Sequence, residues 1–255
     1  MNKLMGDQDM LELKNISFNV EDESGGMEII RDVSLSIPDG KLVVITGPNG
    51  GGKSTLAKLI AGIYRPSSGT VIFDGEDITS LSITERARKG ISYAFQQPVR
   101  FKGLQVLDLI RLARGTGVTP AQACEYLSAV GLCARDYIDR EVNASLSGGE
   151  LKRIEIAMIL ARGTKLSVFD EPEAGIDLWS FQNLIEVFKT LRSEISGNSI
   201  LIISHQERIL NIADEVIVLK EGRLEKRGSR DEILPELLAK AIAVPECRMG
   251  AERSR

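Results

Sequence analysis

The sequence predicts an α/β fold in which helices cover a mainly parallel β-sheet. Short apolar, β-branched runs, each with the length and character of a strand buried on both faces, recur at 41–46, 166–169, 200–203 and 216–219. Helical patterns lie between these runs, at 54–63, 147–162 and 178–195. Because strands that alternate with helices along the chain are typical of parallel sheets, the two patterns together indicate one α/β core.

An N-terminal antiparallel β subdomain is predicted ahead of this core. Residues 11–20 and 27–37 alternate between apolar and polar side chains, and the polar stretch 21–26 has the character of a hairpin connection. The core and its additions are expected to form one domain over 1–244. The remaining residues, 245–255, carry no pattern and are expected to be a flexible C-terminal tail.

A helical subdomain, inserted into the core at about 83–163, is the third predicted part. Residues 106–113 and 119–130 have helical patterns, and strand signals are sparse through the middle of this stretch. Thr119 is suited to cap the second helix, and Pro120 is suited to its first position.

The composition excludes several classes of protein. Of 255 residues, 43% are apolar and 27% are charged, which is the balance of a globular domain. Acidic residues outnumber basic ones by 36 to 32, and this predicts no nucleic-acid partner. The longest apolar run, 156–161, has six residues, whereas a membrane-spanning helix needs roughly 20. No membrane span is therefore predicted, and the chain is expected in the cytoplasm. Three scattered cysteines and a single histidine predict no zinc site.

A phosphate-binding loop is predicted between a strand and a helix. Residues 47–54 match the pattern G-x-x-x-x-G-K-[ST] at every fixed position, and the alternative is a glycine-rich turn before a helix. Backbone N–H groups of such a loop surround phosphate oxygens, the lysine faces the β- and γ-phosphates, and the serine hydroxyl is a Mg²⁺ ligand. The predicted nucleotide-binding residues are Gly47, Pro48, Asn49, Gly50, Gly51, Gly52, Lys53, Ser54 and Thr55, with ATP and Mg²⁺ as the cofactors.

Two carboxylates follow the predicted strand at 166–169. Asp170 and Glu171 are expected at the edge of the sheet that also carries the phosphate loop, because the carboxyl ends of parallel strands share one edge. Asp170 is then a candidate Mg²⁺ ligand. Glu171 is the candidate general base that activates water. The alternative is that both acids are solvated loop residues.

A second glycine motif, at 146–150, begins a helix. Ser147 and Glu150 have capping-box spacing, which explains these two residues in purely structural terms. Gly148 and Gly149 leave the helix N-terminus uncovered, so that it is suited to accept an anion. Since one nucleotide is already held by the phosphate loop, this second phosphate-binding site would serve a nucleotide that a partner holds.

Taken together, these motifs resemble an ATP-binding-cassette (ABC) ATPase from about residue 11 to residue 228. The resemblance implies that Ser147, Gly148, Gly149 and Glu150 contact the γ-phosphate held by the other subunit of an ATP-dependent homodimer. It also implies roles for three further residues. Gln96 corresponds to a glutamine that senses Mg²⁺ and water, Asp177 to an aspartate at the dimer interface, and His205 to a histidine at the γ-phosphate.

Within this superfamily, several details resemble the ATPase of Suf-type iron–sulfur cluster assembly. Lys152-Arg153 and Glu155-Ile156 follow the second glycine motif, where transporter motors usually carry Gln-Arg and a small or apolar residue. This resemblance implies a Suf-type scaffold protein as the partner. The alternative is the ATP-binding subunit of a membrane transporter, whose partner is a membrane permease; Pro172 favours that alternative. Val20 stands where many cassettes stack adenine on an aromatic side chain.

Overall fold

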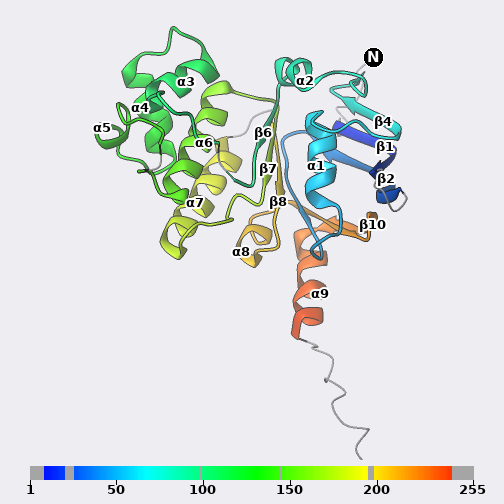
Figure 1. The fold of residues 1–255 in the computed structure, drawn as a ribbon. Coiled ribbons are helices and arrows are strands. Elements are labelled where there is room, and N and C mark those ends of the chain that lie inside the picture. Colours follow the sequence, from blue (N-terminus) through cyan, green and yellow to red (C-terminus); the bar gives the residue numbers. More distant parts are fainter. Residues whose placement is uncertain (1–8, 21–25, 98, 144, 195–197, 243–255) are drawn as a thin grey trace, which may run out of the picture.

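The computed structural model describes residues 9–20, 26–97, 99–143, 145–194 and 198–242. The predicted hairpin connection, apart from Gly26, and the predicted C-terminal tail lie outside these residues. Figure 1 shows two sheets that lie beside a group of packed helices, with the last helix extending away from the body of the domain.

The N-terminal sheet is antiparallel, as predicted, and it is larger than the predicted hairpin. Its strand order is β2-β1-β4-β5, with bounds β1 Asp9–Val20, β2 Met27–Pro38, β4 Ser68–Phe73 and β5 Glu76–Asp77. The strands β4 and β5 had no clear signal in the sequence, since they are short and carry glycine and charged residues.

The core sheet is parallel except at one edge. Its order is β10-β9-β3-β8-β7-β6, and β10 pairs antiparallel with β9. The bounds are β3 Leu42–Thr46, β6 Ile91–Ala94, β7 Leu166–Asp170, β8 Ser199–Ile203, β9 Glu215–Lys220 and β10 Arg223–Ser229. The four apolar runs found in the sequence are therefore all strands of this sheet.

Both faces of the parallel strands of the core sheet are buried, and each face belongs to a separate hydrophobic core. In β3, Leu42 and Val44 pack in one core with the helices, whereas Val43 and Ile45 pack in the other with α1 and the N-terminal sheet. Successive residues of a strand point to opposite faces. A strand covered on both sides must therefore be apolar at every position, which is why these strands were recognisable as continuous apolar runs.

The helices cover the two faces unequally. Figure 1 shows α1 on the same side as the N-terminal strands, and α3 to α7 on the other side. The bounds are α1 Lys53–Ala61, α2 Ile83–Lys89, α3 Val106–Arg114, α4 Pro120–Ala129, α5 Ala134–Tyr137, α6 Gly148–Arg162, α7 Leu178–Glu194, α8 Glu207–Leu210 and α9 Arg230–Ile242. Thr119 caps α4 and Pro120 is its first residue, as expected. In the part of the chain that is described, no helix is long and apolar enough to cross a bilayer.

The predicted helical range, 83–163, contains two elements that belong with the core. Strand β6 pairs with β7 in the core sheet, and α2 lies against α1 and β6. The helices that pack on one another in this range are α3, α4, α5 and α6. The helical region of the structure therefore starts after β6, later in the chain than residue 83.

The topology brings four chain segments to one edge of the sheet. Strands β3, β8, β7 and β6 are neighbours and run parallel, so that their carboxyl ends lie side by side. The segments that follow them carry the phosphate loop, His205, Glu171 and Gln96. In open α/β sheets, ligands bind at the carboxyl ends of the parallel strands.

Candidate functional site

The phosphate loop joins β3 to α1 and requires glycine at two positions. Gly47 has φ +139°, and a Cβ there would lie 1.9 Å from the carbonyl oxygen of Leu219. Gly52 caps α1 at φ +92°, where a Cβ would lie 2.7 Å from Cδ1 of Ile30. Both positions therefore exclude a side chain. The loop from Asn49 to Thr55 lines a cavity of about 490 Å³, which the helix N-terminus makes suitable for an anion.

Lys53 is the buried cation of this loop. Its Nζ donates hydrogen bonds to the carbonyl oxygens of Gly47 and Pro48, at 2.9 Å each. Burial lowers the pKa of the Lys53 ammonium, while the charges of Glu171 and Asp170 act in the opposite direction. The side chain thus holds its charge across the inside of the loop, beside the two acidic residues that follow β7.

Asp170 is held by hydroxyl groups on both sides. Ser54 donates its Oγ hydrogen to Oδ1 at 2.8 Å, and Tyr93 donates its phenol hydrogen to Oδ2 at 2.7 Å. Asp170 is buried at the end of β7, and Tyr93 comes from the neighbouring strand β6. Burial and this bond to the carboxylate raise the pKa of Tyr93, so that it stays a donor. Sequence reasoning missed Tyr93; its one signal was a place near the carboxyl end of a strand.

Glu171 and Gln96 meet beside the same cavity. The Nε2 group of Gln96 donates a hydrogen bond to Oε2 of Glu171, and both residues line the cavity with the phosphate loop. Glu171 has φ +42°, a left-handed conformation that costs a non-glycine residue about 1–3 kcal/mol. This sharp turn directly after β7 places Glu171 on the rim of the cavity, next to the Asp170 that ends the strand. The structure therefore brings together Lys53, Ser54, Asp170, Glu171 and Gln96.

Glu173 connects the segment after β7 to the segment after β8, and sequence reasoning missed it too. Ser204 donates its hydroxyl hydrogen to Oε1 of Glu173 and accepts the backbone N–H of Gln206 at 3.0 Å. The other carboxylate oxygen, Oε2, is buried and has no hydrogen-bond partner among the described residues. Burial raises the pKa of Glu173, although the bond from Ser204 acts against that rise. The carboxylate thereby shapes the turn that carries His205.

His205 is exposed after β8, and the structure does not bring it to the phosphate loop. Its Nε2 lies 3.4 Å from Nε2 of Gln206, and it is absent from the described residues that line the phosphate-loop cavity. Its expected contact with a γ-phosphate stays a prediction.

The second glycine motif forms the N-terminus of α6, as expected. The Ser147 hydroxyl accepts the N–H of Glu150 at 3.2 Å, and the Ser147 N–H donates to Oε2 of Glu150 at 2.6 Å, which completes the capping box. Oε1 of Glu150 accepts from the phenol of Tyr137. Glu150 is thus engaged in stabilising the helix start, and its predicted contact with nucleotide stays a prediction.

This helix start opens onto a cavity of its own. Gly148 lines a space of about 620 Å³ with Gln96, Gln97 and Gly175, whereas the described residues of the phosphate-loop cavity include none of 147–150. Gln96 lines both spaces. The two glycine-rich helix starts of one chain are therefore separate sites.

Asp177 caps α7. Its Oδ1 accepts the backbone N–H groups of Trp179 and Ser180, at 3.0 Å each. The bonds from Ser180 are the main cause of a lowered pKa of the Asp177 carboxyl; burial acts against them, and the bond from Trp179 lowers the pKa further. A role at a dimer interface is untested by this geometry and stays a prediction.

The residues at the phosphate loop fit Mg²⁺ by their chemistry. Ser54, Asp170 and Gln96 offer oxygen atoms, the donors that Mg²⁺ prefers. Over the described ranges, no group of three or more His, Cys, Asp or Glu side chains could hold a metal alone. Magnesium in such sites usually takes one or two protein ligands and completes its shell with phosphate oxygens and water, which suits a loop that binds a triphosphate.

Apolar side chains also line the phosphate-loop cavity. Met27 and Ile29 of β2 lie there, and Met27 is exposed over 65% of its surface. Val20 pairs with Met27 across the hairpin. Phe18 stacks on Tyr64 at a ring distance of 5.2 Å and is thus occupied within the fold.

The similarities to known proteins agree with this geometry. The sequence profile described as ABC transporter matches residues 30–174. An uncharacterized ABC transporter ATP-binding protein of Methanocaldococcus jannaschii is 40% identical over an alignment of 217 residues, and the match covers 82% of this chain and 86% of that protein. A probable ATP-dependent transporter, ycf16, of Cyanophora paradoxa is 33% identical and is covered to 89%, with 87% of this chain covered.

Among solved structures, the fold resembles a dimeric ATP-binding cassette in a post-hydrolysis state, bound to ADP and Pi. The TM-score is 0.77 at 27% identity, and the match covers 87% of this chain and 99% of that chain. The match confirms the predicted ABC-type nucleotide-binding fold. The chain therefore belongs to the ABC transporter family, as one of its ATP-binding cassettes.

Proposed function

We propose that this chain binds ATP with Mg²⁺ at the phosphate loop and hydrolyses it to ADP and phosphate. The observation that carries the proposal is the direct bond between Ser54 of the loop and Asp170 of β7, beside Glu171 and Gln96. The phosphate loop and a candidate base thus line one cavity, and the candidate metal-ligating carboxylate is bonded to the loop residue Ser54. Positioning and electrostatic stabilisation of this kind supply most of the catalysis in phosphoryl transfer.

The roles of individual residues are part of this proposal. The loop amides and Lys53 hold the phosphates, and bound Mg²⁺ would supply charge stabilisation on the phosphate oxygens through Ser54, Asp170 and Gln96. Glu171 accepts a proton from the attacking water. Its carboxylate receives a hydrogen bond from Gln96, and this bond orients it toward the cavity.

The active form is proposed to be a head-to-tail homodimer. Ser147, Gly148 and Gly149 of one copy complete the phosphate site of the other, with Asp177 at the interface and His205 at the γ-phosphate. The separation of the two helix starts within one chain supports this arrangement. ATP must favour the closed pair over the open one for closure to follow binding.

Transport is the proposed task of this ATPase, with a membrane permease as the partner and the cytoplasm as the compartment. The narrower expectation of a Suf-type cluster-assembly ATPase has no support from the similar proteins, because the relatives described above carry transporter names. These names favour the alternative that the sequence left open. The Lys152 and Glu155 details that suggested the Suf type do not identify a partner.

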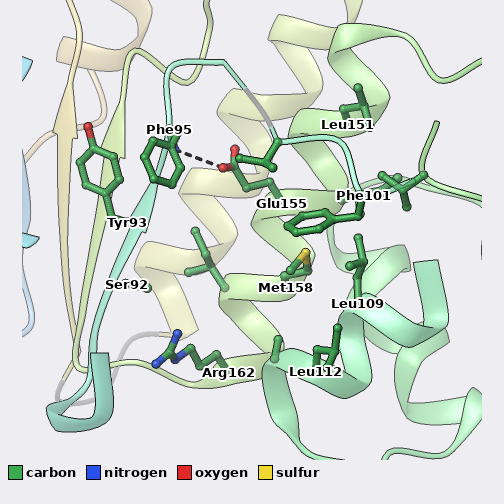
Figure 2. Close-up of a pocket in the computed structure, with 15 residues that line it drawn as sticks. Ser92, Tyr93, Phe95, Phe101, Leu109, Leu112, Leu151, Glu155, Met158 and Arg162 are labelled. Carbon is green, nitrogen blue, oxygen red and sulfur yellow. Dashed lines mark hydrogen bonds between the residues drawn. The ribbon is translucent and has the colours of Figure 1, made fainter. Parts of the chain in front are cut away.

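An apolar cavity supports a partner-binding role for the helical region. It measures about 380 Å³ and lies between β6 and the helices α3 and α6. Its lining includes four exposed apolar side chains, those of Phe95, Val99, Phe101 and Leu112. Figure 2 shows that the residues lining the cavity come from several elements. An exposed apolar hollow of this kind marks an interaction site, which suits an apolar segment of a permease.

Affinity purification from the native host tests the choice of partner. A tagged Glu171→Gln chain, purified with ATP and Mg²⁺ in the presence and absence of detergent, is expected to retain an integral membrane protein only with detergent. Recovery of a water-soluble scaffold protein without detergent would instead restore the cluster-assembly interpretation. Phosphate release by the wild-type complex, with and without Mg²⁺, tests the ATPase activity itself.

A further inference from the structure

A charged pair is buried on α6, one turn beyond its glycine-rich start. Lys152 and Glu155 form an ion pair at 3.0 Å, and their side chains are 1% and 17% exposed. Taking two charges out of water is costly unless further hydrogen bonds satisfy them. The partners that satisfy this pair are therefore informative.

Both charges are bonded to the backbone of one residue, Phe95. Nζ of Lys152 donates to the Phe95 carbonyl oxygen, and Oε1 of Glu155 accepts the Phe95 N–H at 3.1 Å. Figure 2 shows the Phe95–Glu155 bond at the wall of the apolar cavity. Strand β6 ends at Ala94. Phe95 is the first residue beyond the strand, and its backbone N–H and carbonyl groups are bonded to side chains of α6.

The next residue along the chain is Gln96, whose amide donates to Glu171. A continuous set of contacts thus runs from α6 through Phe95 and Gln96 to the candidate general base. Ser147 lies at the start of the same helix, and Lys152 lies five residues further, which is about 7.5 Å along a helix.

We propose that Lys152 and Glu155 are positioning residues that fix Gln96 to α6, so that the position of α6 sets the placement of Gln96 against Glu171. This inference rests on the proposed ATPase function and deepens it. A contact that moves the N-terminus of α6, or an apolar side chain that enters the cavity beside Glu155, then alters the geometry of hydrolysis. The ion pair therefore transmits a movement of α6 to Gln96. An apolar pair of equal volume would not do so, because it cannot bond the backbone of Phe95.

A double-mutant cycle between Glu155 and Gln96 tests this route. Glu155→Gln is expected to lower kcat about ten-fold and to change the affinity for ATP by less than two-fold. If Glu155 acts through Gln96, the double variant with Gln96→Ala is no slower than Gln96→Ala alone. Losses that multiply would overturn the proposal. Glu186→Gln is the matched control, since Glu186 forms an exposed i,i+3 pair with Lys189 on α7.

A second variant separates positioning from stability. Lys152→Met combined with Glu155→Leu keeps the core filled, and such apolar replacements of buried ion pairs often fold with equal or greater stability. It is expected to keep its Tm and ATP affinity and to lose about ten-fold in kcat. A stable variant with unchanged kcat contradicts the role.

Hydrogen exchange gives a readout that does not depend on turnover. The Phe95 amide should exchange at least ten-fold faster in the Met/Leu variant than in wild type, with the amides of α7 unchanged. Equal exchange rates of the Phe95 amide in the variant and in wild type would contradict the proposal, even if the enzyme is active. A wild-type chain with the protected amide but no ATP hydrolysis would contradict the proposed function and leave the contact to Phe95 standing.

Discussion

The phosphate loop and the start of α6 are both glycine-rich helix N-termini, yet their side chains carry opposite charge. The loop places the ammonium of Lys53 against its own carbonyl oxygens. The start of α6 places the carboxylate of Glu150 on the N–H of Ser147. Exposed amides alone attract an anion modestly, by about 0.3–1 kcal/mol at a helix terminus. Under the proposed function, the added cation makes the loop the main site for a triphosphate, and the start of α6 adds a weaker contribution.

The residues that surround the phosphate loop and the start of α6 differ as well. The loop contacts Asp170 through Ser54 and shares a cavity with Glu171. The start of α6 faces a different space, where Gln96 is the residue common to both. Backbone geometry therefore makes each site receptive to phosphate, and the surrounding side chains decide which one supports chemistry.

The largest effect is expected at Glu171. Glu171→Gln keeps the side-chain shape and an acceptor for Gln96 but removes the base, so that kcat should fall by about 10²- to 10⁴-fold while ATP still binds. Light scattering with ATP should then show a dimer that wild type forms only transiently. Normal phosphate release by this variant would exclude Glu171 as the base.

Lys53→Ala should abolish tight ATP binding. Loss of a charged hydrogen-bond donor to phosphate is worth about 1.5–3 kcal/mol, so calorimetry should show an affinity at least ten- to hundred-fold weaker. Alanine suits the first turn of α1, and the fold should persist. Lys58→Ala on the same helix is the control, since Lys58 lies over the ring of Tyr64. Equal affinities for ATP in the two variants would show that the Lys53 cation does not distinguish the phosphate loop from the start of α6.

At α6 the effect should be smaller and should concern dimerisation. Ser147→Asp keeps a good helix cap and adds a negative charge where the γ-phosphate of the other copy is proposed to bind. ATP-dependent dimerisation should weaken by about ten-fold, with monomer affinity for ATP unchanged. Ser147→Asn, a neutral cap of the same shape, should dimerise normally. If the Asp and Asn variants behave alike in ultracentrifugation, α6 does not approach a phosphate.

The smallest effect is a pH dependence at Glu173. Its pKa is raised above the ordinary 4.5 in the folded chain, so the folded state binds more protons than the unfolded state between the two pKa values. Stability contributed by this group is then present below pH 4.5 and is lost as pH rises through the raised pKa. Relative to Glu173→Gln, wild type should lose free energy of unfolding over that window. Denaturant titrations at several pH values that show a constant difference would contradict the assignment.

Prediction from sequence was accurate where the cause is local. The glycine-rich loop between β3 and α1, the capping box of α6 and the apolar strands β3, β7, β8 and β9 each depend on residues within one short segment. Tyr93 and Glu173 were missed because their partners are 77 and 31 residues away. The range predicted for the helical subdomain, 83–163, included β6, whose membership of the core sheet depends on pairing with β7.

The amino-acid sequence by itself determined the family, the phosphate loop and the pair Asp170 and Glu171, because spacing along the chain fixes a loop, a cap and a strand end. The tertiary structure alone decided that Tyr93 holds Asp170, that Glu173 holds Ser204 and that Lys152 and Glu155 hold Phe95. The physical reason is that each of these bonds joins elements whose adjacency follows from strand order and helix packing, and hydrophobic burial sets those only when the whole chain has folded.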